Sequence, residues 1–529
     1  SSIHVDRVPP LPDSLIRNGD NLIAPGSAMS GSIKSDFSAG VTLMSLAIWL
    51  EQAVLFLMFI VYARLLGAET VGVGMMAIAV VLLGETLVRE TFSDFLIQRV
   101  DLQRGHLSAA FWLLTGLALV IMGVFWIAAP AIAAAYDEPQ VADLLRVASV
   151  TVLFVAVAAV PVASLRRRLA FSTLAVRTVL GPVLGGAAGL AAALGGWGVW
   201  SLVIQRVVQG AVTDGLVWLA EKWRPDFSFR KQHLADVWQF SSRMLGLRSA
   251  GVFAVQTPSY AIGIFLGPAA LALYTAAWRL VDALAFLIVA PIRFVSQPAF
   301  AALRRGEQAG AALLHDVSHA SSLITFASFA GVAAVASPLL TVLLGKDWSA
   351  AAPILQVLAV VGLYTTIERI HETYCLAMGR ASAMLGFAAA EALLGAGVCF
   401  LAAPYGAHVV AAAVSLRYLV IWPFRINFTT RLAQVEGWQY IREFSGPGFL
   451  SIVMAVIVVG WRETIGHILP PVIDLATSVL LGATLYLGLC WFVLKERVQR
   501  AASLFKLPGG SNPELPTDDP DLQQTRLKP

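Results

Sequence analysis

Long apolar runs separated by short polar turns make up most of the chain. Runs of about 18–25 apolar residues recur, and at about 1.5 Å per residue each can cross a hydrocarbon core about 30 Å thick. The runs are continuous and do not alternate with period two, which excludes a β-barrel. We therefore predict an all-α, polytopic membrane protein with about fourteen transmembrane helices, near residues 41–62, 71–96, 107–129, 143–164, 173–194, 198–220, 238–265, 269–297, 318–343, 351–377, 382–402, 407–428, 446–464 and 472–494.

One helix hairpin occurs twice. The stretch 62–72 joins the first two apolar runs and the stretch 264–272 joins the seventh and eighth, and both contain Leu-Gly with a branched residue four positions after the glycine. Further segments pair at a similar offset and in the same order: 142–147 with 352–357, and 197–200 with 405–408. These pairs favour internal duplication, with two pseudo-repeated six-helix lobes followed by two C-terminal helices.

Composition excludes a soluble globule. With 58% hydrophobic and 13% charged residues and a mean hydropathy of +0.75, the 529-residue chain has too few polar side chains to cover a surface in water. The formal charge of +4 comes mostly from loop Lys and Arg, so it indicates topology and not nucleic-acid binding. The three cysteines lie in apolar segments without CxxC spacing, so they indicate neither disulfides nor a zinc site, and we expect no metal.

Basic residues are concentrated in alternate loops. If the N-terminus is cytoplasmic, the loops on that side carry nineteen Lys and Arg, with Arg166 and Arg177 among them, whereas the opposite loops carry four. The positive-inside bias places both termini in the cytoplasm. The expected domains are a disordered cytoplasmic N-tail (1–37), an N-lobe (38–220), a cytoplasmic linker (221–237), a C-lobe (238–430), two further spans (431–495) and a largely disordered cytoplasmic C-tail (496–529).

Ionisable side chains inside the spans are the main candidates for function. A charge at the bilayer centre costs roughly 2.5–3.5 kcal/mol, so each one needs a partner or a watery cavity. Glu85 and Arg89 stand four residues apart on one span, and Arg279 and Asp282 are one turn apart on another, so each pair can neutralise itself. We assign Arg89, Arg279 and Arg369 to a phosphate, and Glu51, Glu85, Asp282, Glu368, His371 and Glu372 to a coupling ion or to the polar wall of a cavity.

Two interpretations of these charges stay open. They are either structural ion pairs and snorkelling groups, or the lining of a polar lumen between two six-helix lobes. In a lumen, arginine suits a phosphate, which it grips bidentately, and carboxylates and His371 suit a coupling proton or Na⁺. Pro258 falls in the middle of a span and predicts a kink, which is either static or the hinge that lets one lobe rock against the other.

Two stretches resemble catalytic motifs, but each lacks a residue that the motif requires. Gly345-Lys346 lacks the first glycine and the following Ser or Thr of a phosphate-binding loop. His371-Glu372 begins like a zinc-protease helix, but Cys375 stands where the second histidine belongs. We therefore expect no enzyme and no cofactor apart from a coupling Na⁺ or H⁺.

Seven short tracts have a specific order and spacing: Ala63-Arg64-Leu65-Leu66-Gly67 with Gly72; Leu96-Ile97-Gln98-Arg99; Arg166-Arg167-Arg168-Leu169-Ala170-Phe171; Gly195-Gly196-Trp197-Gly198-Val199-Trp200-Ser201-Leu202; Trp223-Arg224-Pro225; Tyr260-Ala261-Ile262-Gly263 with Leu266-Gly267; and Tyr274-Thr275-Ala276-Ala277-Trp278-Arg279-Leu280. With these tracts the chain, over about residues 38–495, resembles the polysaccharide (oligosaccharide-lipid) flippases of the multidrug/oligosaccharidyl-lipid/polysaccharide exporter superfamily.

The resemblance implies a V-shaped pair of lobes that opens alternately to either side of the bacterial inner membrane. It implies movement of an undecaprenyl-diphosphate-linked oligosaccharide repeat unit to the outer leaflet, for surface polysaccharide or exopolysaccharide. In such flippases cavity arginines hold the diphosphate and an ion gradient is often coupled, and we carry the first role to Arg89, Arg279 and Arg369.

The partners implied are the lipid-linked oligosaccharide, membrane lipids and, as further candidates, a polysaccharide polymerase and glycosyltransferases. The basic inner loops suit contact with glycosyltransferases, and anionic lipid explains them equally well. Two other functions stay open. A cation-coupled multidrug exporter of the same superfamily would be favoured by a predominantly acidic cavity, and a non-transport scaffold of a polysaccharide assembly complex needs no charges inside the membrane.

Overall fold

The computed structural model describes residues 31–98, 103–227, 231–302 and 307–495, together with 497 and 499. This part of the chain is helical throughout and contains no strand, which confirms the all-α prediction. Its helices are α1 (Gly31–Gln98), α2 (Arg104–Ala135), α3 (Gln140–Ala148), α4 (Val150–Arg167), α5 (Phe171–Leu194), α6 (Trp200–Ala220), α7 (Lys231–Ala302), α8 (Glu307–Ala334), α9 (Ala336–Leu344), α10 (Ala352–Ala377), α11 (Ala381–Ala402), α12 (Ala407–Leu432), α13 (Gly437–Thr464) and α14 (Pro471–Val493).

Two helices are far longer than a bilayer requires, and each is bent at one glycine. α1 has 68 residues and α7 has 72, and their non-helical residues are Gly67 (φ 76°, ψ 171°) and Gly267 (φ 79°, ψ −174°). Glycine adopts this positive φ without a steric penalty. Glu51 and Glu85 lie on opposite sides of Gly67 and line one cavity, although an unbroken helix would separate them by about 50 Å. The predicted repeat of the hairpin is therefore confirmed in the backbone.

The tips of the two hairpins touch each other. A methyl group placed on Gly72 would lie 1.9 Å from the carbonyl oxygen of Pro268, so the two backbones are in direct contact there. Each tip also meets an aromatic side chain of the opposite half. The indole N–H of Trp348 donates to a carbonyl of α1 at 3.1 Å, and the ring of Tyr136 packs against the backbone of α7 at Gly263. α1 and α7 thus form the seam between the halves.

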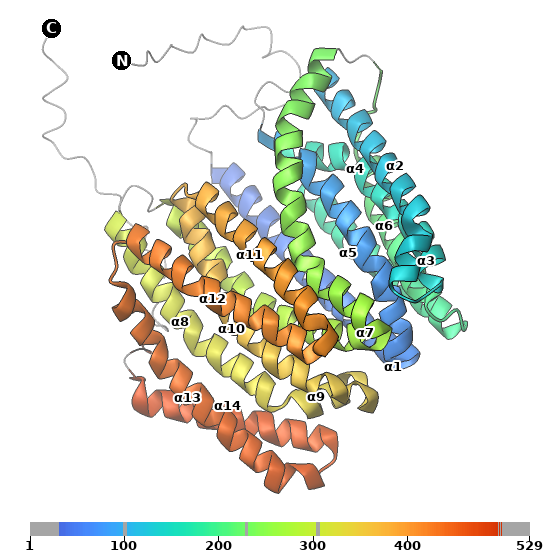
Figure 1. The fold of residues 1–529 in the computed structure, drawn as a ribbon. Helices are drawn as coiled ribbons and strands as arrows, with labels where there is room; N and C mark the ends of the chain where they lie inside the picture. Colours follow the sequence, from blue (N-terminus) through green and yellow to red (C-terminus); the bar gives the residue numbers. More distant parts are fainter. Residues whose placement is uncertain are drawn as a thin grey trace, which may run out of the picture.

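The remaining helices gather on the two sides of this seam (Figure 1). α2 to α6 pack beside α1, and α8 to α12 pack beside one another and α7. α13 and α14 cover the outer edge of the second half, against α8 and α9. The two C-terminal helices therefore add to the C-terminal half and not to the seam.

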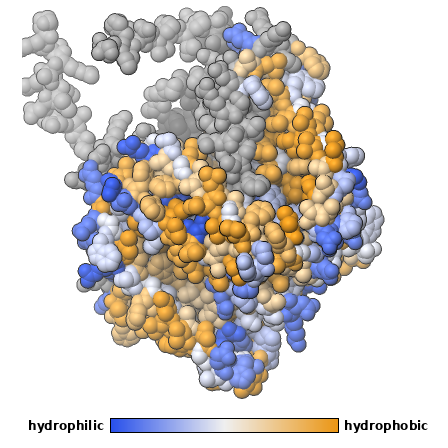
Figure 2. Space-filling view, viewed as in Figure 1, coloured by the Kyte–Doolittle hydropathy of each residue, from blue (hydrophilic) through white to orange (hydrophobic). Residues whose placement is uncertain are grey.

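Eleven helices of the described residues are long and apolar enough to cross a membrane. Two of them, Ala39–Arg89 and Val255–Ile292, contain the bends at Gly67 and Gly267 and therefore correspond to two predicted spans each, whereas α6, which was predicted as a span, is not among the eleven. Large apolar side chains face outward, such as Ile127, Leu219 and Phe492. They cover most of the face in Figure 2, with hydrophilic residues mainly toward its margins. The chain is a multi-pass membrane protein.

Several predicted boundaries are wrong. The span predicted at 318–343 extends past the end of α8 into α9, whereas the candidate span there is Gly310–Ala334. The span predicted at 143–164 lies within the candidate span Gln140–Arg167, in which α3 and α4 meet at Ser149, whose hydroxyl donates to the Arg146 carbonyl at 2.7 Å. α1 already begins at Gly31 and α7 at Lys231, because a helix can extend past the apolar part that marks a span. The predicted tails, 1–37 and 496–529, otherwise lie almost wholly outside the described residues.

Candidate functional site

The N-terminal half encloses a polar cavity of about 540 Å³. α1, α4, α5 and α6 supply its wall, and α5 and α6 approach closely there because α5 presents glycines to its neighbour. A methyl group on Gly185 would lie 2.7 Å from the Gln205 carbonyl, so only glycine allows this packing. The charged and polar residues of the wall are Glu51, Glu85, Arg89, Thr151, Arg166, Arg177, Thr178, Arg206, Gln209, Thr213 and Asp214.

Four arginines and three carboxylates line this cavity. Two arginines have carboxylate partners in the described residues: Arg206 pairs with Glu85, and Arg177 lies 3.8 Å from Asp214. Glu85 also accepts a hydrogen bond from Thr151 at 2.6 Å. The sequence predicted that Glu85 pairs with Arg89 along one helix, and the structure shows that its ion pair is with α6. The lining therefore has one more arginine than carboxylates, and this excess of positive charge suits an anionic ligand.

Arg89 and Arg166 face the same space and lie close enough to repel each other. Glu51, also on the wall, lies within electrostatic range of Arg89 and Arg177. Arg166 and Arg177 were predicted to lie in cytoplasmic loops. Both belong instead to helices, α4 and α5, and line the cavity. Three predicted site residues, Glu51, Glu85 and Arg89, are thus brought together.

The other two predicted phosphate ligands lie elsewhere. The guanidinium carbon of Arg279 lies 4.6 Å from the ring centre of Phe59 and within electrostatic range of Arg206, so Arg279 approaches the cavity from α7 without lining it. Arg369 on α10 pairs with Asp282 of α7 at 3.3 Å. The predicted pairing of Asp282 with Arg279 is therefore replaced by a contact between two helices.

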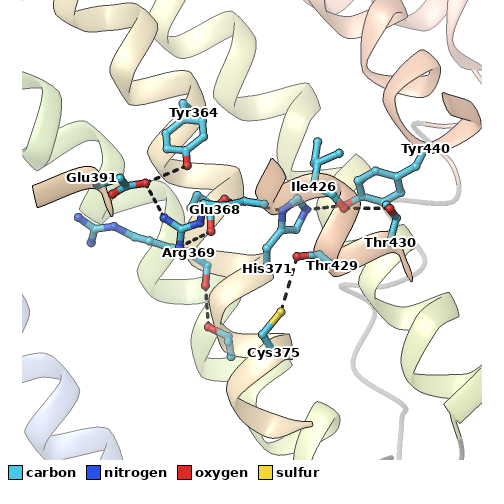
Figure 3. Close-up of polar contacts among 12 residues, drawn as sticks. Tyr364, Glu368, Arg369, His371, Cys375, Glu391, Ile426, Thr429, Thr430 and Tyr440 are labelled. Carbon is cyan, nitrogen blue, oxygen red and sulfur yellow. Dashed lines mark hydrogen bonds and ion pairs between the residues drawn. The ribbon is translucent and has the colours of Figure 1, made fainter. Parts of the chain in front are cut away.

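The C-terminal half contains a buried ionic network (Figure 3). Arg425 of α12 lies 2.5 Å from Glu368 of α10 and 2.7 Å from Glu391 of α11. Tyr364 donates to the same Glu391 at 3.4 Å. The side chains of Glu368 and Arg425 are only 8% and 9% exposed, so packing and not water surrounds this network.

A second branch of polar contacts leads from Glu368 toward α13 (Figure 3). His371 Nε2 lies 2.7 Å from the Tyr440 hydroxyl, and His371 Nδ1 lies 4.0 Å from Glu368 Oε2. Neither Nδ1 nor that carboxylate oxygen has a hydrogen-bond partner among the described residues. The predicted Glu368 and His371 are therefore neighbours, as their shared helix face implies. Glu372 is exposed on α10.

The predicted hinge, Pro258, is buried in α7. The helical backbone continues through it, and the non-helical residue of α7 is Gly267. A role of Pro258 in movement remains a prediction.

Comparison with known proteins places the chain in a family. A family described as polysaccharide biosynthesis protein matches residues 61–353, which is more than half of the chain. The chain belongs to this family. The match covers α1 from residue 61 onward, α2 to α9 and the beginning of α10, so Glu51 on the first part of α1 is a cavity residue outside it.

Two named relatives extend the comparison over most of this polysaccharide biosynthesis protein. It is 25% identical over 413 residues to the teichuronic acid biosynthesis protein TuaB of Bacillus subtilis (strain 168), covering 75% of this chain and 83% of TuaB. It is also 25% identical over 448 residues to the succinoglycan biosynthesis transport protein ExoT of Rhizobium meliloti (strain 1021), covering 83% of this chain and 88% of ExoT.

Solved structures show the same fold. The lipid II flippase MurJ, in an inward closed conformation, matches with a TM-score of 0.72 and 13% identity, over 86% of this chain and all of MurJ (100%). An inward-facing multidrug transporter of the MATE family matches with a TM-score of 0.54 and 14% identity, over 75% of this chain and 99% of that one. The expected resemblance to flippases of this superfamily is confirmed, and the fold is that of a polytopic helical transporter.

Sequence reasoning missed the two arginines that organise the polar groups of this polysaccharide biosynthesis protein. The nearest other charges in their helices, Asp214 and Arg431, lie eight and six residues away, so neither Arg206 nor Arg425 forms a charge cluster in the sequence. A helix-face analysis offered a signal for the first, because Arg206, Gln209 and Thr213 recur at a helical spacing and all line the cavity.

Proposed function

We propose that this protein flips an undecaprenyl-diphosphate-linked oligosaccharide from the cytoplasmic to the outer leaflet of the bacterial inner membrane by alternating access. The observation that carries the proposal is the cavity of about 540 Å³ in which four arginines face three carboxylates. The diphosphate is the anionic part of such a substrate, and guanidinium groups bind phosphate oxygens bidentately. The family, the names of its relatives and the flippase fold all support a role in moving a polysaccharide precursor.

The arrangement of the charges explains why an anion is favoured. Arg206 and Arg177 lie close to carboxylates, and the lining as a whole has one more arginine than carboxylates, with Arg89 and Arg166 near each other. A diphosphate between the two arginines would replace their repulsion by attraction. The cavity volume falls within the range of about 300–1,000 Å³ that is usual for small-ligand sites, so it suits the diphosphate and the adjoining sugar, with the lipid chain in the membrane.

The test is a strain that lacks the gene, complemented with variants of the chain. With Arg89→Ala we expect the diphosphate-linked repeat unit to accumulate and polymer at the surface or in the medium to fall at least ten-fold, because a ligand of the diphosphate is lost. The measurement is extraction of undecaprenyl-linked sugars beside quantification of polysaccharide. Arg146→Ala is the matched control, since Arg146 is a partly exposed residue paired with Asp143 on α3 and far less should depend on it.

Two outcomes would count against the proposal. Normal polymer with Arg89→Ala at a normal protein level would remove the arginine cavity as the diphosphate site. Unchanged polymer in the deletion strain, together with new sensitivity to cationic dyes, would favour the multidrug exporter. The excess of arginine in the cavity argues against that alternative, because cations prefer an acidic site.

We further propose that the C-terminal network couples this movement to a proton or Na⁺. The support is the pair formed by Glu368 Oε2 and His371 Nδ1, which are 4.0 Å apart, buried and without hydrogen-bond partners among the described residues. Two such atoms can share one proton or contact one small cation. In vesicles containing the protein, Glu368→Gln should make flipping independent of the ion gradient, whereas retention of gradient-driven flipping would contradict coupling at Glu368.

A further inference from the structure

Two histidines and a glutamate converge between α8 and α13, next to the end of the C-terminal network, where the ring of Tyr440 lies 5.4 Å from that of His319. His315 and His319 lie four residues apart on α8 and therefore share one face of it. Glu443 on α13 reaches both, with its Oε2 atom 3.0 Å from His315 Nε2 and 3.2 Å from His319 Nε2. Within the described residues, the ligand atoms of these three side chains all lie within 4.8 Å of one another.

We propose that His315, His319 and Glu443 bind a divalent transition-metal ion such as Zn²⁺. Imidazole nitrogen and carboxylate oxygen are ordinary zinc ligands, with bonds of about 2.0–2.2 Å, so two ligands of a tetrahedral ion lie about 3.4 Å apart. The two separations from Glu443 are already close to that value, and the third, between the two imidazoles, is within 4.8 Å. Three protein ligands leave one position for water.

The surroundings of this cluster agree with a metal site. Neither ring nitrogen of His319 makes a hydrogen bond to another described residue, so a metal ion would bind a nitrogen atom that no hydrogen bond occupies. Asp316 lies 3.5 Å from His315 Nδ1, where a carboxylate can orient a ligating imidazole. Arg497 is a cation near the cluster. Its guanidinium donates a hydrogen bond to the Glu443 backbone carbonyl at 2.7 Å and not to the Glu443 carboxylate. The ligand side chains are 12–26% exposed, which leaves an ion a route from solvent.

The position of the cluster indicates what the ion would do. α13 is the first of the two helices that follow the duplicated halves, and α8 belongs to the second half. An ion bound by both helices would tie the C-terminal helix pair to the C-terminal half. The cysteines gave no reason to expect this site, because its ligands are two histidines and a glutamate brought together by the packing of two helices.

The test is metal binding by the full chain, purified in detergent with its affinity tag removed and stripped with a chelator. We expect about one equivalent of Zn²⁺ by equilibrium dialysis and elemental analysis, and a rise of the unfolding temperature on addition of Zn²⁺. His315→Ala and Glu443→Gln should each weaken binding at least ten-fold and remove the rise. His467→Ala is the matched control and should bind like the unaltered chain, because His467 lies in the turn between α13 and α14.

Glu443→Gln preserves the shape of the side chain, so it distinguishes loss of a ligand from failure to fold, and size-exclusion profiles check each variant. Less than a tenth of an equivalent on the unaltered chain would overturn the proposal. Binding that Glu443→Gln and His315→Ala leave intact would overturn it equally, and the three side chains would then be in polar contact without a metal.

Discussion

The two halves of the molecule place their polar groups on three corresponding helices, but the groups differ in the sign of their excess charge. In the first half, α4, α5 and α6 help to enclose a cavity whose arginines outnumber its carboxylates. In the second half, α10, α11 and α12 close around Arg425, which contacts two carboxylates. A duplicated backbone therefore supplies one site with excess positive charge and one with excess negative charge. The shared frame does not decide the sign of the charge in each half, and the side chains placed on it do.

The largest expected effect is the removal of Arg425. Arg425→Ala leaves Glu368 and Glu391 buried without their cation, and breaking a buried ion pair in this way costs about 3–5 kcal/mol. Arg206→Ala is the matched change in the first half, and it should cost less, because Arg206 is 26% exposed at the cavity wall and Glu85 keeps its hydrogen bond from Thr151. Thermal unfolding of both variants in detergent measures the difference.

Equal destabilisation by these two substitutions would contradict the distinction between an open and a closed site. Arg425→Lys serves as a control, because it keeps the charge and should recover part of the stability that Arg425→Ala loses.

A smaller effect is expected from the glycines of the two corresponding helices, α5 and α11. Gly185→Leu places a side chain where a methyl group already lies 2.7 Å from the Gln205 carbonyl, so α5 and α6 must separate, at a cost of about 1–3 kcal/mol. Gly386→Leu on α11 is the matched change, and it meets no atom of the described residues within 4 Å. Unfolding temperature should fall for the first variant and stay within a degree or two for the second, and a fall of the same size in both would show that packing at α5 is not special.

Much of the frame could be predicted from the sequence, because its causes are local. Continuous apolar runs fix the spans, and Gly67 and Gly267 mark the bends since a positive φ there favours glycine. Partners across helices could not be predicted in this way. Glu85 and Arg89 are neighbours along α1, yet Glu85 pairs with Arg206, because helix packing and not sequence distance brings their charges together. The same limit hid Arg425, whose two carboxylate partners come from two other helices.

The contact of the hairpin tips has a consequence for movement. Gly72 touches the Pro268 carbonyl, and Trp348 and Tyr136 each hold the tip of the opposite half. Any motion that parts the halves at this end must break these few contacts together, since they lie on one seam. These contacts therefore hold the two halves together at this end. A bulkier residue at Gly72 would keep the two hairpin tips apart without changing any charged residue of the cavity.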